Sequence, residues 1–222
     1  DNLTIMPETE VERLLFDGSV HQPLDETAVK ATCEEIRARG IKAVAICFLH
    51  AYANFDHELR VKAIVEELCP GLSVCASCEV LPEMREYERM NTTAMNAYVQ
   101  PGVSHYFDRL ENSLRQAGVG ANAHIMQSNG GIMTVATAGR LCVNTALSGP
   151  AAGAQAALML ARLASYEHAI AIDIGGTSAD ISLTYNGRLA YTRDLEIGGH
   201  ALRVTAVDIH TVGAGGGSIA RI

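Results

Sequence analysis

The segment from residue 169 to residue 180 constrains the fold more than any other part of the sequence. An apolar run, Ala169 to Ile174, has the length and composition of a buried strand, and Gly175 and Gly176 follow it at once. From there to Tyr185 apolar and polar residues alternate. Because a period of two is typical of strands, the pattern predicts a strand, a tight glycine turn and a returning strand.

Helical and extended patterns alternate in the first half of the chain. The order is a small hairpin from Val11 to Phe16 that turns at Asp17-Gly18 and returns through Val20, a helix from Asp25 to Arg39, an apolar strand from Ala43 to Leu49, a helix from Phe55 to Leu68 and a strand from Leu72 to Cys75. Gly40 and Pro70-Gly71 end the two helices. Apolar runs separated by helices are typical of parallel strands, so the sequence predicts the α/β class.

The second half begins with a long helical stretch, Glu83 to Gln116, in which we expect Pro101 to interrupt or restart the helix. The elements expected after it are a strand at His124 to Gln127, a turn at Ser128 to Gly131, a helix from Pro150 to Leu163 and a hairpin that turns at Asn186-Gly187 and returns through Leu189 to Thr192. We place a boundary between residues 80 and 81, which divides the chain into two regions, residues 1–80 and residues 81–222.

Composition excludes several classes of function. The formal net charge is −8, so the chain has no excess of positive charge for binding nucleic acid. Neither a leader pattern nor an uninterrupted apolar stretch of membrane-spanning length is present, and we expect a cytoplasmic protein that makes no membrane contact. Its six cysteines are expected to be reduced.

The glycine turn has the chemistry of a phosphate site. Gly175 and Gly176 let phosphate oxygens approach backbone N–H groups, and Thr177 adds a hydroxyl donor. Asp173 and Asp180 would repel phosphate unless a magnesium ion, reached by Asp173 through water, lay between them. The pattern therefore predicts Mg²⁺ and ATP, with Asp173 and Asp180 as the candidate catalytic residues. The alternative is an ordinary glycine turn with two solvated aspartates.

Several motifs in a fixed order support a narrower interpretation. They are Arg85-Glu86-Tyr87-Glu88-Arg89, Thr92-Thr93 with Asn96-Ala97-Tyr98, Gln127-Ser128-Asn129-Gly130-Gly131, Leu147 to Gly153, the loop at 173–180 and Gly213 to Ala220. In this order they resemble the hydantoinase A / 5-oxoprolinase family, which includes acetone-carboxylase-type subunits and belongs to the actin-like ATPase superfamily. The resemblance runs from about residue 11 to residue 222.

The resemblance implies ribonuclease-H-like lobes of the actin, hexokinase and chaperone ATPase type, in which helices cover a mixed sheet. It also implies an ATP-dependent hydrolase that opens a cyclic amide, a lactam or a hydantoin, together with a second subunit of the hydantoinase B type. Gly215 and Gly216 are expected near the nucleotide, although a plain loop is nearly as good an interpretation. The family's N-terminal Asp-x-Gly-Gly-Thr loop is absent from this sequence, so we expect an internal, inactive fragment.

Other interpretations stay open at this point. The same family includes ATP-dependent ketone carboxylases, and a non-catalytic nucleotide clamp or a small-molecule kinase would use the same loop. Cys69, Cys75 and Cys78 could bind zinc, and His200, Asp208 and His210 could gather round a metal, although neither spacing matches a standard set of ligands. The charged run Arg85 to Arg89 has no assigned role. Asn129 lies in a turn that suits either a contact of its side-chain amide with a ligand or the backbone geometry of the turn itself, and His50 and His57 are expected to be structural.

Overall fold

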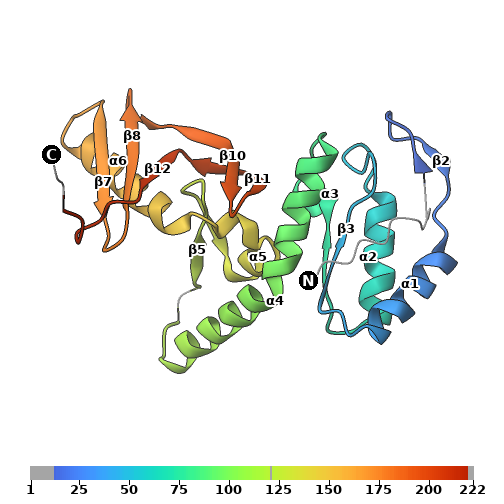
Figure 1. The fold of residues 1–222 in the computed structure, drawn as a ribbon. Helices are drawn as coiled ribbons and strands as arrows, with labels where there is room; N and C mark the ends of the chain where they lie inside the picture. The colour runs from blue at the N-terminus through green and yellow to red at the C-terminus, as the bar shows by residue number, and fades with distance from the viewer. Residues whose placement is uncertain (1–12, 121, 220–222) are drawn as a thin grey trace. The chain divides into compact units, whose positions relative to one another are not determined.

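The computed structural model describes residues 13–120 and 122–219. The chain divides between Gly102 and Val103 into two compact units, and helices and strands alternate in both, which gives the mixed α/β class expected from the sequence (Figure 1). The division at residues 80 and 81, which follows the expected family regions, stays a prediction.

The first unit is built round two parallel strands. Its elements are β1 (Arg13–Leu14), β2 (Val20–Gln22), α1 (Glu26–Ala38), β3 (Ala43–Ile46), α2 (Asp56–Leu68), β4 (Ser73–Ala76) and α3 (Ser77–Val80). β3 pairs in parallel with β4, and α2 connects them. β1 and β2 form the expected hairpin, although Val11, where it was expected to begin, lies outside the described residues.

Local sequence explains where these elements begin and end. The Asp25 side chain accepts hydrogen bonds from the backbone N–H groups of Thr27 and Ala28, at 2.9 and 3.0 Å, and so caps α1 as expected. The strand expected to reach Leu49 ends at Ile46. It ends early because the Phe48 N–H donates to Oε1 of Glu58 at 2.7 Å instead of to a neighbouring strand.

The helix α4 (Glu86–Gln116) begins in the first unit and ends in the second. The expectation that Pro101 would interrupt it is wrong, since the helix runs through Pro101. A proline removes one N–H donor, which leaves only the carbonyl of Ala97 without its helical partner. Packing on both sides, where Asn96 and Phe107 are buried, holds the remaining turns in place.

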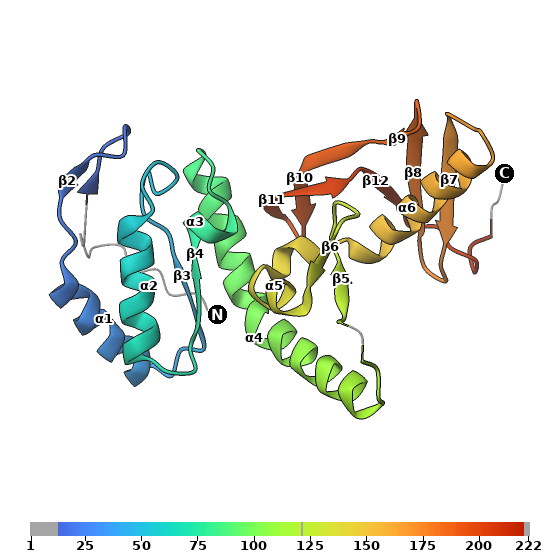
Figure 2. The same ribbon diagram turned by 180° about the vertical axis from the view of Figure 1, so that it is seen from behind.

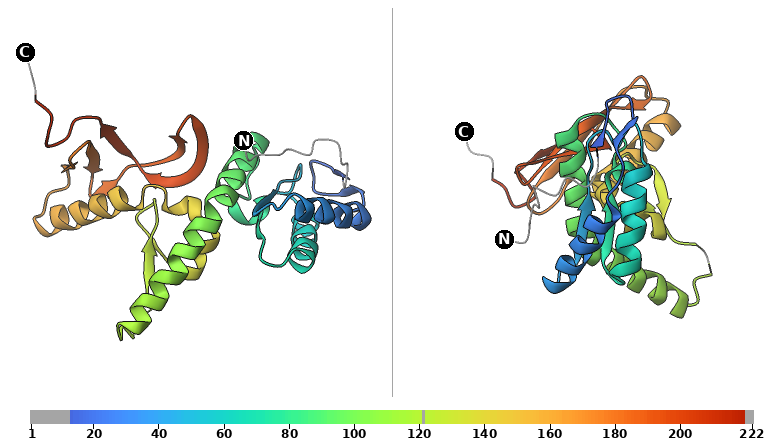
Figure 3. Two further views of the ribbon diagram at one scale, coloured as in Figure 1. Left: turned by 60° about the horizontal axis from the view of Figure 1, so that its bottom comes forward. Right: turned by 90° about the vertical axis from the view of Figure 1, so that its right-hand side faces the viewer.

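The second unit places a helix against one face of an antiparallel sheet. The elements are β5 (His124–Met126), β6 (Ile132–Thr134), α5 (Val135–Arg140), a 3-10 turn (Cys142–Thr145), α6 (Ser148–Leu163), β7 (Ala169–Ile174), β8 (Ala179–Tyr185), β9 (Arg188–Leu189), β10 (Tyr191–Ile197), β11 (His200–Val207) and β12 (Ile209–Val212). The strand order is β12-β8-β7, with β9 also paired to β8, and α6 lies along the sheet (Figures 2 and 3). Ala151, Ala154 and Leu158 of α6 pack with Leu189 and Val207.

One expectation is confirmed and one is corrected in this unit. Consecutive strands pair antiparallel, as the expected hairpins require, because turns of a few residues join them and only antiparallel strands can be joined that way. β7 was expected to be buried, but Ile170, Ile172 and Ile174 are 68, 57 and 64% exposed. These isoleucines alternate with residues that face α6 and lie on the side of the sheet away from it. Among the described helices, none is long and apolar enough to cross a membrane.

Candidate functional site

The loop between β7 and β8 has the expected strand-turn-strand geometry. The Gly175 N–H donates to the Ser178 carbonyl at 2.9 Å and closes the turn. A Cβ built on Gly176 would meet no atom within 4 Å, so this glycine borders open space. Thr177 beside it is exposed. The loop therefore presents backbone and a hydroxyl to a ligand with no side chain in between.

A second glycine loop lies directly against the first. The Gly216 N–H donates to the Gly175 carbonyl at 2.9 Å. A Cβ on Gly215 would lie 2.6 Å from the carbonyl carbon and oxygen of Gly176, closer than real contacts allow. Ser218 fixes this second loop, because its Oγ accepts from the Gly215 N–H at 3.1 Å. The four glycines predicted from sequence thus come together, although the two pairs are about 40 residues apart.

The two candidate carboxylates face each other across the hairpin. Asp173 on β7 is the register partner of Asp180 on β8. Directly opposed side chains of an antiparallel pair lie on the same face, and like charges there destabilise the sheet. Oδ1 of Asp180 accepts from the Thr211 hydroxyl at 2.6 Å, whereas Asp173 is exposed and no protein hydrogen bond to its side chain is found in the described part of the chain.

Helix α6 passes beside Asp173 at a glycine. A Cβ on Gly153 would lie 3.9 Å from Oδ2 of Asp173, so the small residues at the start of α6 let the helix approach the carboxylate. Two carboxylates and open backbone fit a hydrated magnesium ion, which binds few protein ligands and completes its shell with water and phosphate. Asp173 and Asp180 would hold the cation, and Gly175, Gly176 and Thr177 the phosphates.

One residue of the charged motif Arg85 to Arg89, Arg89, lies in a buried cluster in the first unit. Glu58, fully buried, accepts hydrogen bonds from the Phe48 N–H, the Ser77 hydroxyl and the Cys78 N–H at 2.7, 2.6 and 2.8 Å. Nη1 of Arg89, which is 1% exposed, lies 3.6 Å from the same carboxylate. The Arg89 guanidinium also donates to the Phe48 carbonyl at 2.6 Å, to Ser77 and to Glu86.

This cluster explains the motif in structural terms. It ties the start of α4 to α2 and to the ends of β3 and β4, and within the described residues it lies entirely in the first unit. Arg85, by contrast, is exposed and pairs with Glu88 at 3.0 Å. No chemistry follows from the cluster, but sequence analysis alone could not separate the buried Arg89 from the exposed Arg85.

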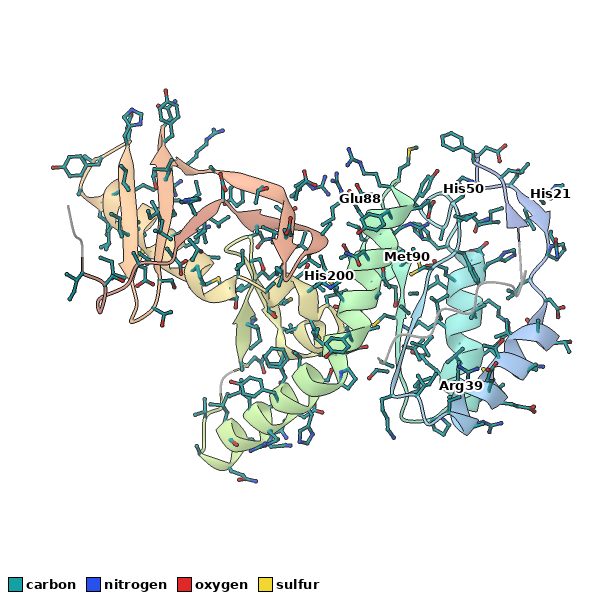
Figure 4. The ribbon with its side chains drawn as sticks, in the orientation of Figure 1. His21, Arg39, His50, Glu88, Met90 and His200 are labelled. Carbon is teal, nitrogen blue, oxygen red and sulfur yellow. The ribbon has the colours of Figure 1, made fainter. Side chains whose placement is uncertain are left out.

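The alternative metal sites do not assemble. The described residues contain no group of three or more histidine, cysteine or acidic side chains placed to hold a metal ion. The Cys69 thiol donates to the Cys33 carbonyl, and the Cys75 thiol lies 3.0 Å from Oε1 of Gln100, in a different environment. His200, labelled in Figure 4, is the first residue of β11, whereas His210 lies on the next strand, β12.

His50 and Asn129 are held by local contacts. His50, labelled in Figure 4, lies in the loop after β3, where its ring lies edge-on to Phe16 and its Nδ1 is 3.2 Å from the Tyr52 hydroxyl. Oδ1 of Asn129 accepts from the Gly131 N–H at 2.7 Å and shapes the turn between β5 and β6.

Comparison with known proteins decides the family. The family model described as Hydantoinase/oxoprolinase matches residues 89–222, and the model of the Hydantoinase/oxoprolinase N-terminal region matches residues 7–69. The chain belongs to the hydantoinase/oxoprolinase family. The resemblance inferred from the ordered motifs is therefore confirmed.

Curated members of the family show similarity over nearly the whole chain. The chain is 37% identical to caprolactamase subunit alpha of Pseudomonas jessenii, and this match covers 95% of the chain. It is 34% identical to 5-oxoprolinase of Saccharomyces cerevisiae, over 88% of the chain. The acetone carboxylase beta subunit of Xanthobacter autotrophicus is 29% identical over 96%. The chain spans only 30, 15 and 30% of these three relatives, respectively.

Solved structures agree with this assignment. The crystal structure of ATP-dependent caprolactamase from Pseudomonas jessenii matches with a TM-score of 0.85 at 37% identity, over 95% of this chain and 30% of that one. The nucleotide-free structure of acetone carboxylase matches with a TM-score of 0.79 at 27% identity, over 92% of this chain and 29% of that one. Members of the hydantoinase/oxoprolinase family thus share this chain's mixed α/β fold, as expected for the actin-like ATPase type.

Proposed function

We propose that the longer protein containing this chain binds Mg-ATP at the Asp173 loop and couples ATP hydrolysis to the opening of a cyclic amide. The contact between the two glycine loops carries the proposal. The backbone of Gly215 and Gly216 packs against that of Gly175 and Gly176, next to the opposed carboxylates of β7 and β8. Two of the relatives are named for opening a ring of this kind, caprolactamase and 5-oxoprolinase.

Each group has a defined part in this mechanism. The N–H groups of Gly176 and Thr177 and the Thr177 hydroxyl bind and orient phosphate oxygens, since the Gly175 N–H closes the turn. Asp173, exposed beside Gly153, positions the hydrated cation, and Thr211 fixes the second carboxylate, Asp180, through its hydroxyl. Bound ATP would supply a phosphoryl group to the amide oxygen, which makes the carbonyl carbon open to attack by water; the ring C–N bond then breaks, the ring nitrogen leaves as an amine, and the phosphoryl group is released as phosphate.

A ketone carboxylase subunit is the second candidate, because similarity to the acetone carboxylase beta subunit also covers 96% of the chain. Both candidates use the same loop for ATP, so the loop does not discriminate between them. The relatives named as subunits also favour a partner of the hydantoinase B type in the assembled enzyme.

Calorimetric titration of Mg-ATP into the full-length protein with its partner subunit tests the proposal. We expect Asp173→Ala to weaken Mg-ATP binding at least tenfold, because the cation loses its carboxylate. Asp208→Ala is the matched control, since Asp208 is an exposed aspartate of the same unit that lies outside the loop. Equal affinity in Asp173→Ala and wild type would remove Asp173 from the site, and release of ring-opened acid distinguishes the hydrolase from a carboxylase.

A further inference from the structure

The turn between β5 and β6 forms one wall of a pocket that the phosphate loop does not use. This open pocket has a volume of about 510 Å³ and is lined by Asn129, Gly130, Gly131, Gln155, Tyr191 and Thr205. All six belong to the second unit. None of these lining residues carries a charge, but they offer two side-chain amides, two hydroxyls and backbone groups.

Buried hydrogen bonds hold this wall in place. Ser128, only 1% exposed, donates from both its N–H and its hydroxyl to the Asn144 carbonyl, at 2.7 and 2.8 Å. Its carbonyl accepts from the Val207 N–H at 2.8 Å, and its Oγ accepts from the Leu147 N–H at 3.2 Å. Ser128 thus ties the turn to β11 and to the start of α6, so the wall is formed before any ligand arrives.

The glycines bring backbone and amide groups close together. Gly130 has a φ of +77°, and a Cβ there would lie 2.4 Å from Nε2 of Gln155, so only glycine permits this approach. Because Oδ1 of Asn129 is used by the Gly131 N–H, its Nδ2 group is the part of that side chain left to meet a ligand. The pocket therefore offers paired amide donors and acceptors.

We propose that this pocket binds the uncharged ring of the cyclic amide substrate, with Gln155 and Asn129 hydrogen-bonded to the ring's C=O and N–H groups. The proposal rests on the proposed function and names the substrate class. An amide ring needs both a donor and an acceptor, which a glutamine side chain supplies together. A ring that carries a carboxylate finds no cation among the lining residues, so the pocket gives it no favourable charge contact.

Helix α6 connects the pocket to the phosphate site. Gly153 lies beside Oδ2 of Asp173, and Gln155 lies beside Gly130. Two residues correspond to a rise of about 3 Å and a rotation of about 200° round the helix axis, so the two contacts lie on different sides of α6. One rigid element therefore sets the separation between the substrate pocket and the candidate cation site.

Steady-state kinetics of the full-length enzyme with its partner subunit test this assignment, with ε-caprolactam as the probe. We expect Gln155→Leu to raise KM for the lactam at least tenfold and to leave KM for ATP within about twofold of wild type, since a tenfold change corresponds to one lost hydrogen bond. Gln127→Leu is the matched control, because Gln127 belongs to the β5–β6 hairpin that forms the wall of the pocket but does not itself line the pocket. An unchanged KM for the lactam in Gln155→Leu would overturn the assignment.

A gain of specificity gives the second measurement. Thr205 is exposed, so Thr205→Lys places a cation at the pocket without disturbing the core. We expect the ratio of kcat/KM for 5-oxoproline to that for ε-caprolactam to rise at least tenfold in this variant. A ratio equal to that of wild type would contradict the assignment.

Two further outcomes separate this inference from the proposed function. If adenosine displaces the lactam and Gln155→Leu raises KM for ATP, the pocket holds the nucleobase and the substrate assignment is wrong. If wild type binds Mg-ATP but opens no lactam, the proposed function fails. Calorimetric titration of ε-caprolactam into wild type and Gln155→Leu then tests the pocket assignment independently of turnover. Loss of lactam binding in the variant supports the assignment, and equal binding overturns it.

Discussion

Gly176 and Gly215 illustrate two different reasons for glycine at neighbouring points of the same site. A side chain at Gly176 would enter open space, whereas one at Gly215 would meet the Gly176 backbone at 2.6 Å. The first glycine leaves room for a ligand, and the second leaves room for protein.

This difference predicts opposite effects of alanine. We expect Gly176→Ala to leave the free energy of unfolding within about 0.5 kcal/mol of wild type but to weaken Mg-ATP binding at least tenfold, because its methyl group occupies the space proposed for phosphate. Gly215→Ala should lower both the free energy of unfolding and the affinity for Mg-ATP, since its methyl group forces the two loops apart. Gly216→Ala is the control for the unfolding free energy, because a Cβ there meets the Gly175 carbonyl at an ordinary 3.7 Å. Urea unfolding and calorimetry measure the two effects; unaltered ATP binding in Gly176→Ala would contradict the phosphate role.

Arg89 and Arg85 give a second contrast within one motif. Arg89→Met leaves the buried Glu58 carboxylate without its cation, and breaking a buried pair in this way costs about 3–5 kcal/mol. Arg85→Ala removes an exposed pair and should change the unfolding free energy by less than about 0.5 kcal/mol. Chemical denaturation of both variants checks the prediction. Similar small losses would mean that the cluster does not stabilise the first unit.

At the scale of elements, the first unit encloses thiols whose ionisation opposes folding, Cys33 on α1 and Cys78 on α3. Burial raises the pKa of Cys78 from its ordinary value of 9.0 to about 12, and the nearby Glu58 carboxylate acts in the same direction. Burial likewise raises the pKa of Cys33 to about 11. These thiols stay protonated in the folded chain at pH values at which the unfolded chain ionises them.

The consequence is a loss of stability in alkali. Since the folded pKa lies above the unfolded one, the contribution is complete below pH 9 and is lost as the pH rises from 9 toward 12. Cys78 alone should lower the unfolding free energy by about 1.4 kcal/mol between pH 8 and pH 10. Urea unfolding of reduced wild type and Cys78→Ala at pH 8 and 10 measures this. The variant should lose less stability than wild type, and equal losses would contradict the raised pKa.

For the molecule as a whole, the sheet of the second unit has one covered face and one exposed apolar face. α6 covers the first, while Ile170, Ile172 and Leu183 are more than half exposed on the second. β7 also ends the strand order β12-β8-β7, so its outer edge is unpaired within the described residues. A free strand edge next to an apolar face promotes association.

We therefore expect the 222-residue chain by itself to bind hydrophobic dye and to self-associate at micromolar concentration. Ile172→Lys should reduce both effects, because it places a charge at the centre of the exposed face. Lys42→Ile, at an exposed lysine of the other unit, adds an apolar residue elsewhere and is the control for overall hydrophobicity. Sedimentation velocity and dye fluorescence are the measurements; a wild-type chain that stays monomeric at all concentrations would contradict the prediction.

Local sequence was sufficient where the determining interactions are local. The run from Ala169 to Ile174, the Asn186-Gly187 turn and the Asp25 cap are set by neighbours within a few residues, and all three agree with the structure. Pro101 was misjudged because packing of α4 on both sides outweighs the loss of one hydrogen bond.

Sequence alone determined the class of fold, the family and the strand-turn-strand form of the segment at 173–180, because strand periodicity, turn chemistry and ordered motifs are properties of short segments. Only the tertiary structure decided that Gly215 lies against Gly176, that Thr211 binds Asp180, that Gln155 meets Gly130 and that the isoleucines of β7 are exposed. These contacts join residues about 25 to 40 positions apart, or depend on which face of a sheet a helix covers. Their energies come from packing and desolvation, which no local pattern in a sequence encodes.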